Sequence, residues 1–445
     1  MRGGARRFTL CVSYLFQPIK LRDLLVPNRV WVSPMCQYSA VDGVPNDWHL
    51  VHLGQFATGG AGLVMAEATA VVPEGRISPA DTGLWNDEQV AAWQRITGFL
   101  RAQGAVPAVQ LAHAGRKAST AVPWEGKESV PESEGGWPTV SSTDQPFGSL
   151  AKPRALRTEE VAELPERFAQ AARRAEAAGF DVVELHFAHG YLAHQFYSPL
   201  VNDRTDRYGG SFDNRVRLLL EITEAVRRVW PDGRPLLARI SATDWVEGGW
   251  TGDDSVRLAR LLAERGVDLV DTSSGGAVPD AHVPVRPGYQ VPFARQIRTE
   301  AGVPTGAVGL ITAPEQAEEI VASGSADAVL LGRALLRDPH WPLHALPGEI
   351  GKYKGRFDEG WDRLREKRLR RMIEMGIIAP HWRLSERDPP RNPRCAEPSG
   401  LCLSLGDALL APRQDRSDQG AHAPAPAMVR QAQVHHRHSA RGADQ

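Results

Sequence analysis

The sequence predicts a (β/α)8 TIM barrel, an α/β fold, because strand-like and helix-like patterns alternate along the chain. Eight short apolar runs, bounded mostly by Gly or Pro, have the length of buried strands. Seven stretches between them repeat apolar residues with the spacing of one helix face. This alternation indicates a parallel sheet, and eight strands favour a closed barrel. An open doubly wound sheet is the alternative, but no G-x-G-x-x-G motif follows the first strand.

The predicted elements can be placed on the sequence in order. The strands are 29–34, 62–69, 106–112, 180–187, 235–241, 267–273, 303–309 and 327–332. The helices are 48–58, 88–103, 159–178, 214–229, 253–265, 292–301 and 314–323. A glycine directly follows several of the helical patterns, as Gly104 and Gly179 do, and glycine readily takes the left-handed conformation that ends many helices. These stop signals support the helix assignments.

The domain organisation follows from where this alternation is interrupted. Residues 114–157 are rich in Pro, Ser, Gly and Trp and separate the third strand from its helix, so we expect a lid loop over the active site. We expect a disordered leader over 1–14, the barrel over 15–350 and a partly helical extension over 351–410, with a basic amphipathic helix at 361–378. Residues 411–445 contain few apolar side chains and are expected to form a disordered tail.

Composition excludes several classes of partner. The 445 residues carry a net charge of −1, which gives no electrostatic basis for binding nucleic acid or an anionic membrane. No apolar run is long enough to cross a bilayer. The four cysteines are scattered and form no C-x-x-C pair, so neither a disulfide scaffold nor a zinc or iron–sulfur site is indicated. We therefore expect a cytoplasmic enzyme or binding protein with a small-molecule partner.

Three polar rings follow the fourth predicted strand: His186, His189 and Tyr191. Ligands bind at the carboxyl ends of barrel strands, and three such rings within six residues each need a polar partner if buried. Two other interpretations remain open. His186 and His189 could bind a metal with His113 and Glu184 nearby, although no further carboxylate clearly completes such a site. The barrel could also bind a small ligand without catalysis.

Other strand ends carry further candidates. Arg239 interrupts an apolar strand, and a buried guanidinium needs an anionic or hydrogen-bonding partner, for which we favour a ligand over a structural ion pair. Gly309 and the Gly332–Arg333 pair end the seventh and eighth strands, where these barrels commonly bind phosphate. A Gly–Arg pair alone is a weak signal, and its position is what makes phosphate binding a useful hypothesis.

Several motifs resemble the Old Yellow Enzyme family of FMN-dependent ene-reductases. They are Ser-Pro-Met-Cys-Gln-Tyr at 33–38, Gln-Leu-Ala-His-Ala-Gly-Arg-Lys at 110–117, His-Phe-Ala-His-Gly-Tyr-Leu at 186–192, Asn-Asp-Arg-Thr-Asp-Arg-Tyr-Gly-Gly-Ser at 202–211, Gly-Ala-Val-Gly at 306–309 and Leu-Gly-Arg at 331–333. The resemblance covers about 15–339. It is strongest to the thermophilic-like subgroup, which carries a cysteine in the first motif.

The resemblance implies a role for each matching residue. FMN would be contacted by Ser33, Pro34, Met35, Cys36, Ala68, Gln110, Arg239, Gly309, Gly332 and Arg333. Tyr38, His186 and His189 would bind the substrate oxygen, and Tyr191 would donate the proton. NADPH or NADH would reduce FMN, which would then reduce an activated alkene, and no metal would be needed. Cys36 would tune the flavin potential and not act as a nucleophile.

The chain departs from this family pattern in two places. Members of the subgroup end with an arginine that enters a neighbouring subunit's active site, and only Arg356 loosely matches it here. A homo-oligomer, a dimer or tetramer, follows from the resemblance alone. Phe187 occupies a position between the histidines where a smaller residue is expected. It would either narrow the site or pack into the body of the barrel.

Overall fold

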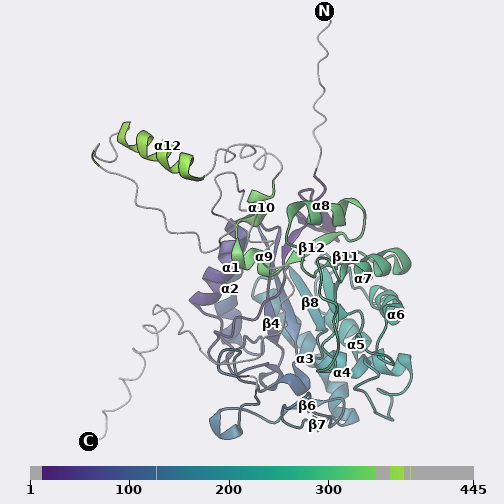
Figure 1. The fold of residues 1–445 in the computed structure, drawn as a ribbon. Coiled ribbons are helices and arrows are strands. Elements are labelled where there is room, and N and C mark those ends of the chain that lie inside the picture. Colours follow the sequence, from purple (N-terminus) through teal and green to yellow (C-terminus); the bar gives the residue numbers. More distant parts are fainter. Residues whose placement is uncertain (1–12, 127, 347–360, 375–380, 382–445) are drawn as a thin grey trace, which may run out of the picture. The chain divides into compact units, whose positions relative to one another are not determined.

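Eight parallel strands close into a barrel, which confirms the predicted (β/α)8 fold (Figure 1). The computed structural model describes residues 13–126, 128–346, 361–374 and 381. The barrel strands are β3 (Val30–Val32), β4 (Leu63–Ala70), β5 (Val106–Ala112), β8 (Val182–Phe187), β9 (Leu236–Ser241), β10 (Leu269–Ser273), β11 (Thr305–Ala307) and β12 (Ala328–Leu331). They are adjacent in chain order, and β12 pairs with β3 to close the barrel.

Helices surround the barrel, as expected for strands that are apolar on both faces (Figure 1). The longer ones are α1 (Asp47–Thr58), α2 (Asp87–Ala102), α3 (Thr158–Ala177), α5 (Phe212–Arg227), α6 (Gly252–Ala263) and α8 (Pro314–Ala322). Short helices are α4 (Leu192–Tyr197), α7 (Val291–Gln296), α9 (Arg333–Arg337) and α10 (Trp341–His344). A π-helical turn, Ile297–Ala301, continues α7 and completes the predicted helix at 292–301. Gly104 and Gly179 have φ of 85°, which confirms them as left-handed stop residues.

A small antiparallel hairpin precedes the barrel and was missed in the sequence. Its strands are β1 (Ile19–Leu21) and β2 (Leu24–Val26). Ile19, Leu21 and Val26 pack in one buried cluster with residues from the beginnings of several barrel strands, including Trp31 and Leu63. The hairpin therefore covers the amino-terminal mouth of the barrel, which leaves the carboxyl ends of the strands for the site.

The long segment between β5 and α3 has the position of the predicted lid loop. It contains short 3-10 helices at Gly115–Lys117 and Glu132–Glu134, and the two-residue strands β6 (Val140–Ser141) and β7 (Arg154–Ala155). Its Lys117 Nζ donates to the backbone oxygens of His189 and Gly276, at 2.8 and 2.7 Å. The loop thus contacts the chain at the carboxyl ends of β8 and β10, where the polar rings were predicted to lie.

The terminal segments are described only in part. Ser13 Oγ and Tyr14 N–H both donate to the Glu318 carboxylate, which joins the end of the predicted leader to α8. The chain divides into two compact units, 1–354 and 355–445. In the second unit α12 (Trp361–Glu374) lies within the predicted basic helix, whereas Arg356 and the predicted tail over 411–445 lie outside the described residues. Among the described helices, none combines the length and apolarity that crossing a membrane requires.

Candidate active site

The three polar rings predicted at the end of β8 lie together. The ring centroid of His186 is 5.1 Å from that of His189 and 5.0 Å from that of Tyr191, and His189 and Tyr191 are 6.5 Å apart. All three pairs meet edge to face. Phe187 faces the other way and is fully buried in the main hydrophobic cluster, so it packs into the body of the barrel. The rings therefore form one site at the carboxyl end of the barrel.

The turn that carries these rings is held by its backbone. His189 and Gly190 have φ of 61° and 72°, in the left-handed region. Gly190 N–H donates to His194 Nδ1 at 2.8 Å, and His194 Nε2 lies 2.8 Å from the buried Asp244 carboxylate. A side chain at Gly190 would collide with the backbone oxygen of Gly276. The strained turn therefore persists because α4 and the loop after β10 fix it.

His186 has a defined tautomer. Its Nδ1 accepts a hydrogen bond from Ala188 N–H at 3.3 Å, so the ring proton lies on Nε2. Burial, and then the positive charge of Arg239, lower the pKa of His186 well below its ordinary value. The same two causes lower the pKa of His189. Both rings are neutral at physiological pH, and each therefore offers one N–H donor.

His189 is oriented by Ser273 at the end of β10. His189 Nε2 and Ser273 Oγ are 2.6 Å apart. Ser273 Oγ also lies 3.4 Å from Gln290 Oε1, to which Ser274 Oγ donates at 2.6 Å. An amide oxygen accepts two hydrogen bonds, so Ser273 either donates to Gln290 and accepts from His189 Nε2–H, or donates to His189 Nε2. The contact therefore fixes the orientation of the His189 ring and not its tautomer. The sequence motifs gave no indication of this contact.

Replacing Ser273 with alanine is expected to slow turnover about 3–10-fold, the usual net effect of one lost hydrogen bond. Without the hydroxyl, the His189 ring loses the contact that holds its orientation. Steady-state measurement of kcat tests this. Ser274→Ala is the matched control, because that hydroxyl donates to Gln290 and not to His189. Equal effects of the two substitutions would contradict a role of Ser273 in orienting His189.

Tyr191 is positioned as a neutral phenol. It is the residue before the first turn of α4, and its backbone oxygen accepts from Gln195 N–H at 2.9 Å. Burial raises the pKa of Tyr191 well above its ordinary value, and the nearby Cys36 and Tyr38 add to the effect. The side chain therefore keeps its proton throughout the physiological range.

The segment after β3 lies at the same site. Ser33 Oγ accepts from an Arg239 guanidinium nitrogen at 3.3 Å, and Met35 Sδ lies near Gly332. Tyr38 has φ of 50° and packs edge to face with Trp124 of the lid loop at 6.0 Å. Burial, followed by the charges of Cys36 and nearby acids, raises the pKa of Tyr38. The structure thus joins the first motif to the lid loop.

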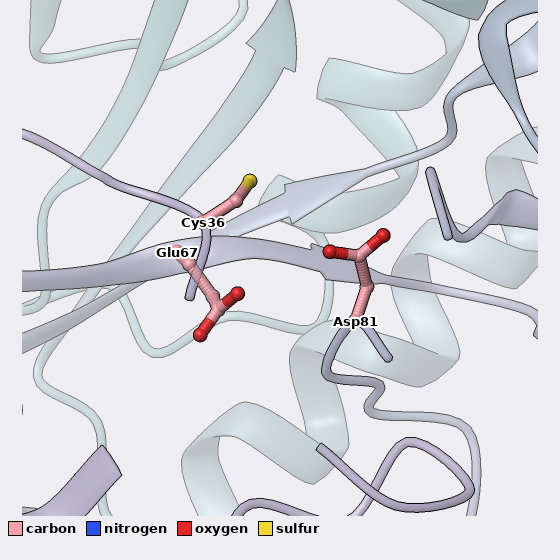
Figure 2. A group of neighbouring side chains, drawn as sticks. All are labelled: Cys36, Glu67 and Asp81. Carbon is pink, nitrogen blue, oxygen red and sulfur yellow. The ribbon is translucent and has the colours of Figure 1, made fainter. Parts of the chain in front are cut away.

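Cys36 has two acidic neighbours that the sequence did not indicate. Figure 2 shows Cys36 with Glu67 of β4 and Asp81 of the following loop, whose candidate ligand atoms all lie within 4.8 Å of one another. Among the described residues this is the only group of thiol, imidazole and carboxylate side chains close enough to share a metal, so the histidines of β8 form no such group. Glu67 already accepts from Gln37 N–H at 2.9 Å and lies 3.2 Å from His49 Nε2.

Asp81 is a carboxyl of this cluster with an unpaired oxygen. One of its oxygens accepts from Ser78 N–H, while Oδ1 is buried and has no hydrogen-bond partner among the described residues. Burial, and then the charge of Glu67, raise the pKa of Asp81 to about 7. The same environment raises the pKa of Cys36, first through burial and then through Asp81 and Glu67. Cys36 is therefore a thiol at physiological pH, and its role beside the flavin stays a prediction.

We expect the wild-type protein to lose folding stability as pH rises from 5 to 8, and we expect the Asp81→Asn variant to lose less. A raised carboxyl pKa means that the folded protein keeps a proton that the unfolded chain releases, so stability is lost as pH rises from 3.8 to about 7. A shift of this size corresponds to roughly 4 kcal/mol at most. Thermal midpoints at both pH values test this, with the exposed Asp47→Asn as control. An unchanged pH dependence in Asp81→Asn would contradict the assignment.

A row of polar side chains lines the barrel wall below the rings. Gln110 Nε2 donates to Glu184 Oε1 at 2.7 Å, and Arg239 Nε lies 3.0 Å from Asp271 Oδ2. The structural ion pair that we ranked below a ligand is therefore present at Arg239, and contact of Arg239 with a ligand stays a prediction. Ala68 lies beside Gln110, since a bulge at Glu67 shifts the β4 register.

The glycines predicted to bind phosphate lie on neighbouring strands. Gly309 follows β11, has φ of 109° and would have a Cβ only 3.0 Å from Gln290 Nε2. Gly332 follows β12 and precedes α9, and Arg333 is exposed. Gly309 and Gly332, which have no side chain to obstruct a ligand, therefore lie at the ends of neighbouring strands, and Arg333 adds a positive charge beside Gly332. Their contact with phosphate stays a prediction.

These residues fit FMN chemically. Arg239, Ser33 and Gln110 supply polar groups for the pyrimidine end of an isoalloxazine ring, and the two glycine segments leave room for a ribityl phosphate. Two further residues were missed in the sequence. Lys117 joins two loops of the site, and burial, then Arg116, lower its pKa to about 7. Asp271 could have been suspected, because a carboxylate inside an apolar strand needs a partner.

Comparison with known proteins agrees with this geometry. Residues 14–348 match the NADH:flavin oxidoreductase / NADH oxidase family. An NADPH dehydrogenase from Geobacillus thermodenitrificans is 45% identical over 355 residues, which are 78% of this chain and 99% of the relative. The structure of morphinone reductase is similar with a TM-score of 0.64 and 29% identity, covering 76% and 90% of the two chains. An old yellow enzyme homologue from Zymomonas mobilis gives 0.62 and 28%, covering 74% and 91%.

The barrel and its polar site define an FMN-dependent oxidoreductase. The chain belongs to the NADH:flavin oxidoreductase / NADH oxidase family, which confirms the predicted relationship to Old Yellow Enzyme. It is an NAD(P)H-dependent flavin oxidoreductase, with FMN as cofactor and a nicotinamide as reductant.

Proposed function

We propose that the enzyme reduces the activated C=C bond of α,β-unsaturated carbonyl or nitro compounds. The observation that carries this proposal is the contact of Tyr191 with the two neutral histidines, at 5.0 and 6.5 Å between ring centroids. A proton donor beside two N–H donors suits a substrate whose oxygen is hydrogen-bonded while a nearby carbon is protonated. When bound, FMN accepts hydride from NAD(P)H and supplies hydride to the alkene.

His186 and His189 bind the substrate oxygen. Their Nε2–H and Nδ1–H groups are proposed to donate to the carbonyl or nitro oxygen and to stabilise the negative charge that develops on it. For His189 this role requires the tautomer in which Ser273 Oγ donates to Nε2. Donation withdraws electrons from the β-carbon, which makes that carbon a better hydride acceptor. Tyr38, in the segment after β3, is proposed as a further contact to the substrate. Because the histidines are neutral, the site holds the oxygen without protonating it fully.

Tyr191 then protonates the α-carbon. Its phenol holds its proton at Oη because burial raises its pKa, so it is available as an acid at neutral pH. Lys117 lies 5.8 Å from the Tyr191 ring centroid and links the loops on either side of it. The proton donor is therefore supported by both the lid loop and α4.

The residues proposed to hold FMN surround this site. Ser33, Pro34, Met35 and Cys36 follow β3, and Ala68 and Gln110 lie side by side on β4 and β5. Arg239 is proposed to face the pyrimidine end of the ring, where a cation stabilises negative charge on the cofactor. Gly309, Gly332 and Arg333 are proposed to bind the phosphate. Cys36, as a thiol, is proposed to adjust the flavin potential.

The assembly is proposed to be a dimer or a tetramer, with Arg356 contributing to the neighbouring subunit's site. This rests on the family resemblance, since Arg356 lies outside the described residues. A non-catalytic barrel and a metal enzyme are the competing functions. Neither has use for a neutral phenol placed beside two neutral imidazoles, and the flavin family match speaks for the ene-reductase.

The decisive experiment follows the visible spectrum of the purified protein under anaerobic conditions. A yellow protein should bleach with NADPH and recover its colour when cyclohexenone is added, with saturated ketone as the product. Product analysis distinguishes alkene reduction from reoxidation by another route. A protein that bleaches but is not reoxidised by enones or nitroalkenes would refute the proposed substrate class while leaving the flavin chemistry in place.

A further inference from the structure

Glu184 is the buried carboxyl group for which the proposed reaction has no use. It lies on β8 directly beside Gln110 of β5 in the strand register, and His186 two residues later lies beside Arg239 of β9. Paired residues of parallel strands face the same side of the sheet, as do residues two apart on one strand. Glu184, Gln110 and His186 therefore line the same wall of the barrel, with Glu184 one layer below the substrate site.

The contact between Gln110 and Glu184 fixes the Gln110 amide. Among the described residues, the Gln110 side-chain amide donates one hydrogen bond, to Glu184 Oε1 at 2.7 Å, and both side chains are at most 2% exposed. An ionised carboxylate only accepts, and a carboxyl protonated at Oε2 still accepts through Oε1, so in both of these states the amide nitrogen faces β8. The flipped orientation would bring two oxygens together at that distance unless the carboxyl proton lay on Oε1. Gln110 Oε1 is consequently left facing away from Glu184 as an unused acceptor.

The surroundings of Glu184 favour this role over that of an ion-pair partner. Arg239 is already paired with Asp271 at 3.0 Å, and Glu184 Oε2 has no hydrogen-bond partner in the part of the chain that the structure describes. Burial, then the negative charge of Asp271, raise the pKa of Glu184, against the smaller opposing effect of Arg239. A proton on Oε2 would leave Oε1 free to accept. The Gln110 contact is therefore available whether or not the carboxyl is ionised.

We propose that Glu184 is a positioning residue for FMN: it holds the Gln110 amide so that Oε1 is presented as an acceptor to the N3–H of the flavin pyrimidine ring. This inference rests on the proposed contact between Gln110 and FMN. N3–H is the single ring donor at that edge of a flavin, and C2=O and C4=O on either side are acceptors. A freely rotating amide would present its NH2 group to N3–H half of the time.

The dissociation constant of FMN from the holoenzyme, measured by the fluorescence of released FMN on dilution, tests this inference. In Glu184→Leu, presenting Oε1 to the flavin leaves the Gln110 NH2 group buried without an acceptor, a cost that the FMN-free protein avoids by turning the amide, so the dissociation constant should rise roughly tenfold. Glu184→Gln offers an amide oxygen in the same place and should stay within about threefold of wild type. If Glu184→Gln binds FMN as weakly as Glu184→Leu, the charge of Glu184 and not the orientation of the Gln110 amide determines FMN affinity, and the proposal fails.

A double-mutant cycle separates positioning from general damage to the barrel. In a Gln110→Leu background, Glu184→Leu should change FMN affinity less than about threefold, because the amide it orients is absent. An equal loss in both backgrounds would show that Glu184 acts independently of Gln110 and would overturn the proposal.

A reciprocal exchange covers the case in which Glu184→Leu does not fold. Gln110→Glu alone places two carboxyls together and should weaken FMN binding, and adding Glu184→Gln should restore it, since the new amide donates to the new carboxylate. If the double variant Gln110→Glu/Glu184→Gln binds FMN no more tightly than Gln110→Glu alone, the inference is refuted. These outcomes are distinct from failure of the proposed function, because a wild-type protein that binds FMN but reduces no alkene still reports on Glu184.

Discussion

Replacing Tyr191 with phenylalanine is expected to slow alkene reduction about 10²–10⁴-fold, the usual contribution of a positioned general acid. The phenol ring packs edge to face against His186 at 5.0 Å between centroids, and its raised pKa keeps it protonated at neutral pH. Phenylalanine keeps the ring and its edge-to-face contacts but removes the proton. The measurement is the rate at which a reduced enzyme is reoxidised by cyclohexenone in a rapid-mixing spectrophotometer.

The half-reactions distinguish this role from a structural one. Reduction of the flavin by NADPH needs no proton from the phenol, so Tyr191→Phe should keep that rate within a few-fold of wild type. Tyr197→Phe serves as the matched control, because its hydroxyl donates to Ser241 O at 3.2 Å within the core and lies outside the proposed proton path. Loss of both half-reactions in Tyr191→Phe would indicate a distorted site, and an unchanged rate with the enone would exclude Tyr191 as the proton donor.

The barrel was predictable because the alternation of strand-like and helix-like patterns is repeated along the chain. The third predicted strand, 106–112, coincides with β5, and all of its residues are buried as a barrel strand requires. The seventh, 303–309, is longer than β11 (Thr305–Ala307), since an apolar run does not show where pairing ends. The hairpin β1–β2 was missed because three-residue strands are too short to show periodicity.

The part of the site that lies within one sequence motif was predictable. The part that is formed by segments far apart in the sequence was not. His186, His189 and Tyr191 lie within one turn, so their proximity follows from the sequence. Asp81 lies in a loop with no pattern of its own, and it reaches Cys36 only through the folding of the chain after β4. Glu67 occupies the β4 bulge, a register change that no propensity indicates.

Arg239 shows how far residue-level reasoning reaches. A guanidinium inside an apolar strand correctly indicated a buried charge that needs a partner. The partner is Asp271, itself inside an apolar run on the adjacent strand, and only the strand order places the two together. Two unusual charges on sequential barrel strands therefore favour an ion pair, even where a ligand is also bound.

Replacing His186 or His189 with alanine is expected to lower the rate of alkene reduction about 10²-fold each, the typical effect of losing one donor to a developing oxyanion. The double substitution should lose more than either single one. Because burial and Arg239 lower both pKa values, the rings remain neutral, and the rate with a saturating enone should not report histidine ionisation between about pH 6 and pH 8.

A matched pair of variants tests donation itself. His189→Asn keeps an N–H donor of similar reach and should retain much more activity than His189→Ala, whereas a metal-binding histidine would lose its ligand nitrogen in both. Adding a chelator such as EDTA should leave the wild-type rate unchanged if the rings bind substrate oxygen. If both variants and the chelator abolish activity alike, the rings are metal ligands, and the oxygen-binding role has to be given up. A retained rate in His189→Asn would instead show that the function of this position is to present one N–H to the substrate oxygen.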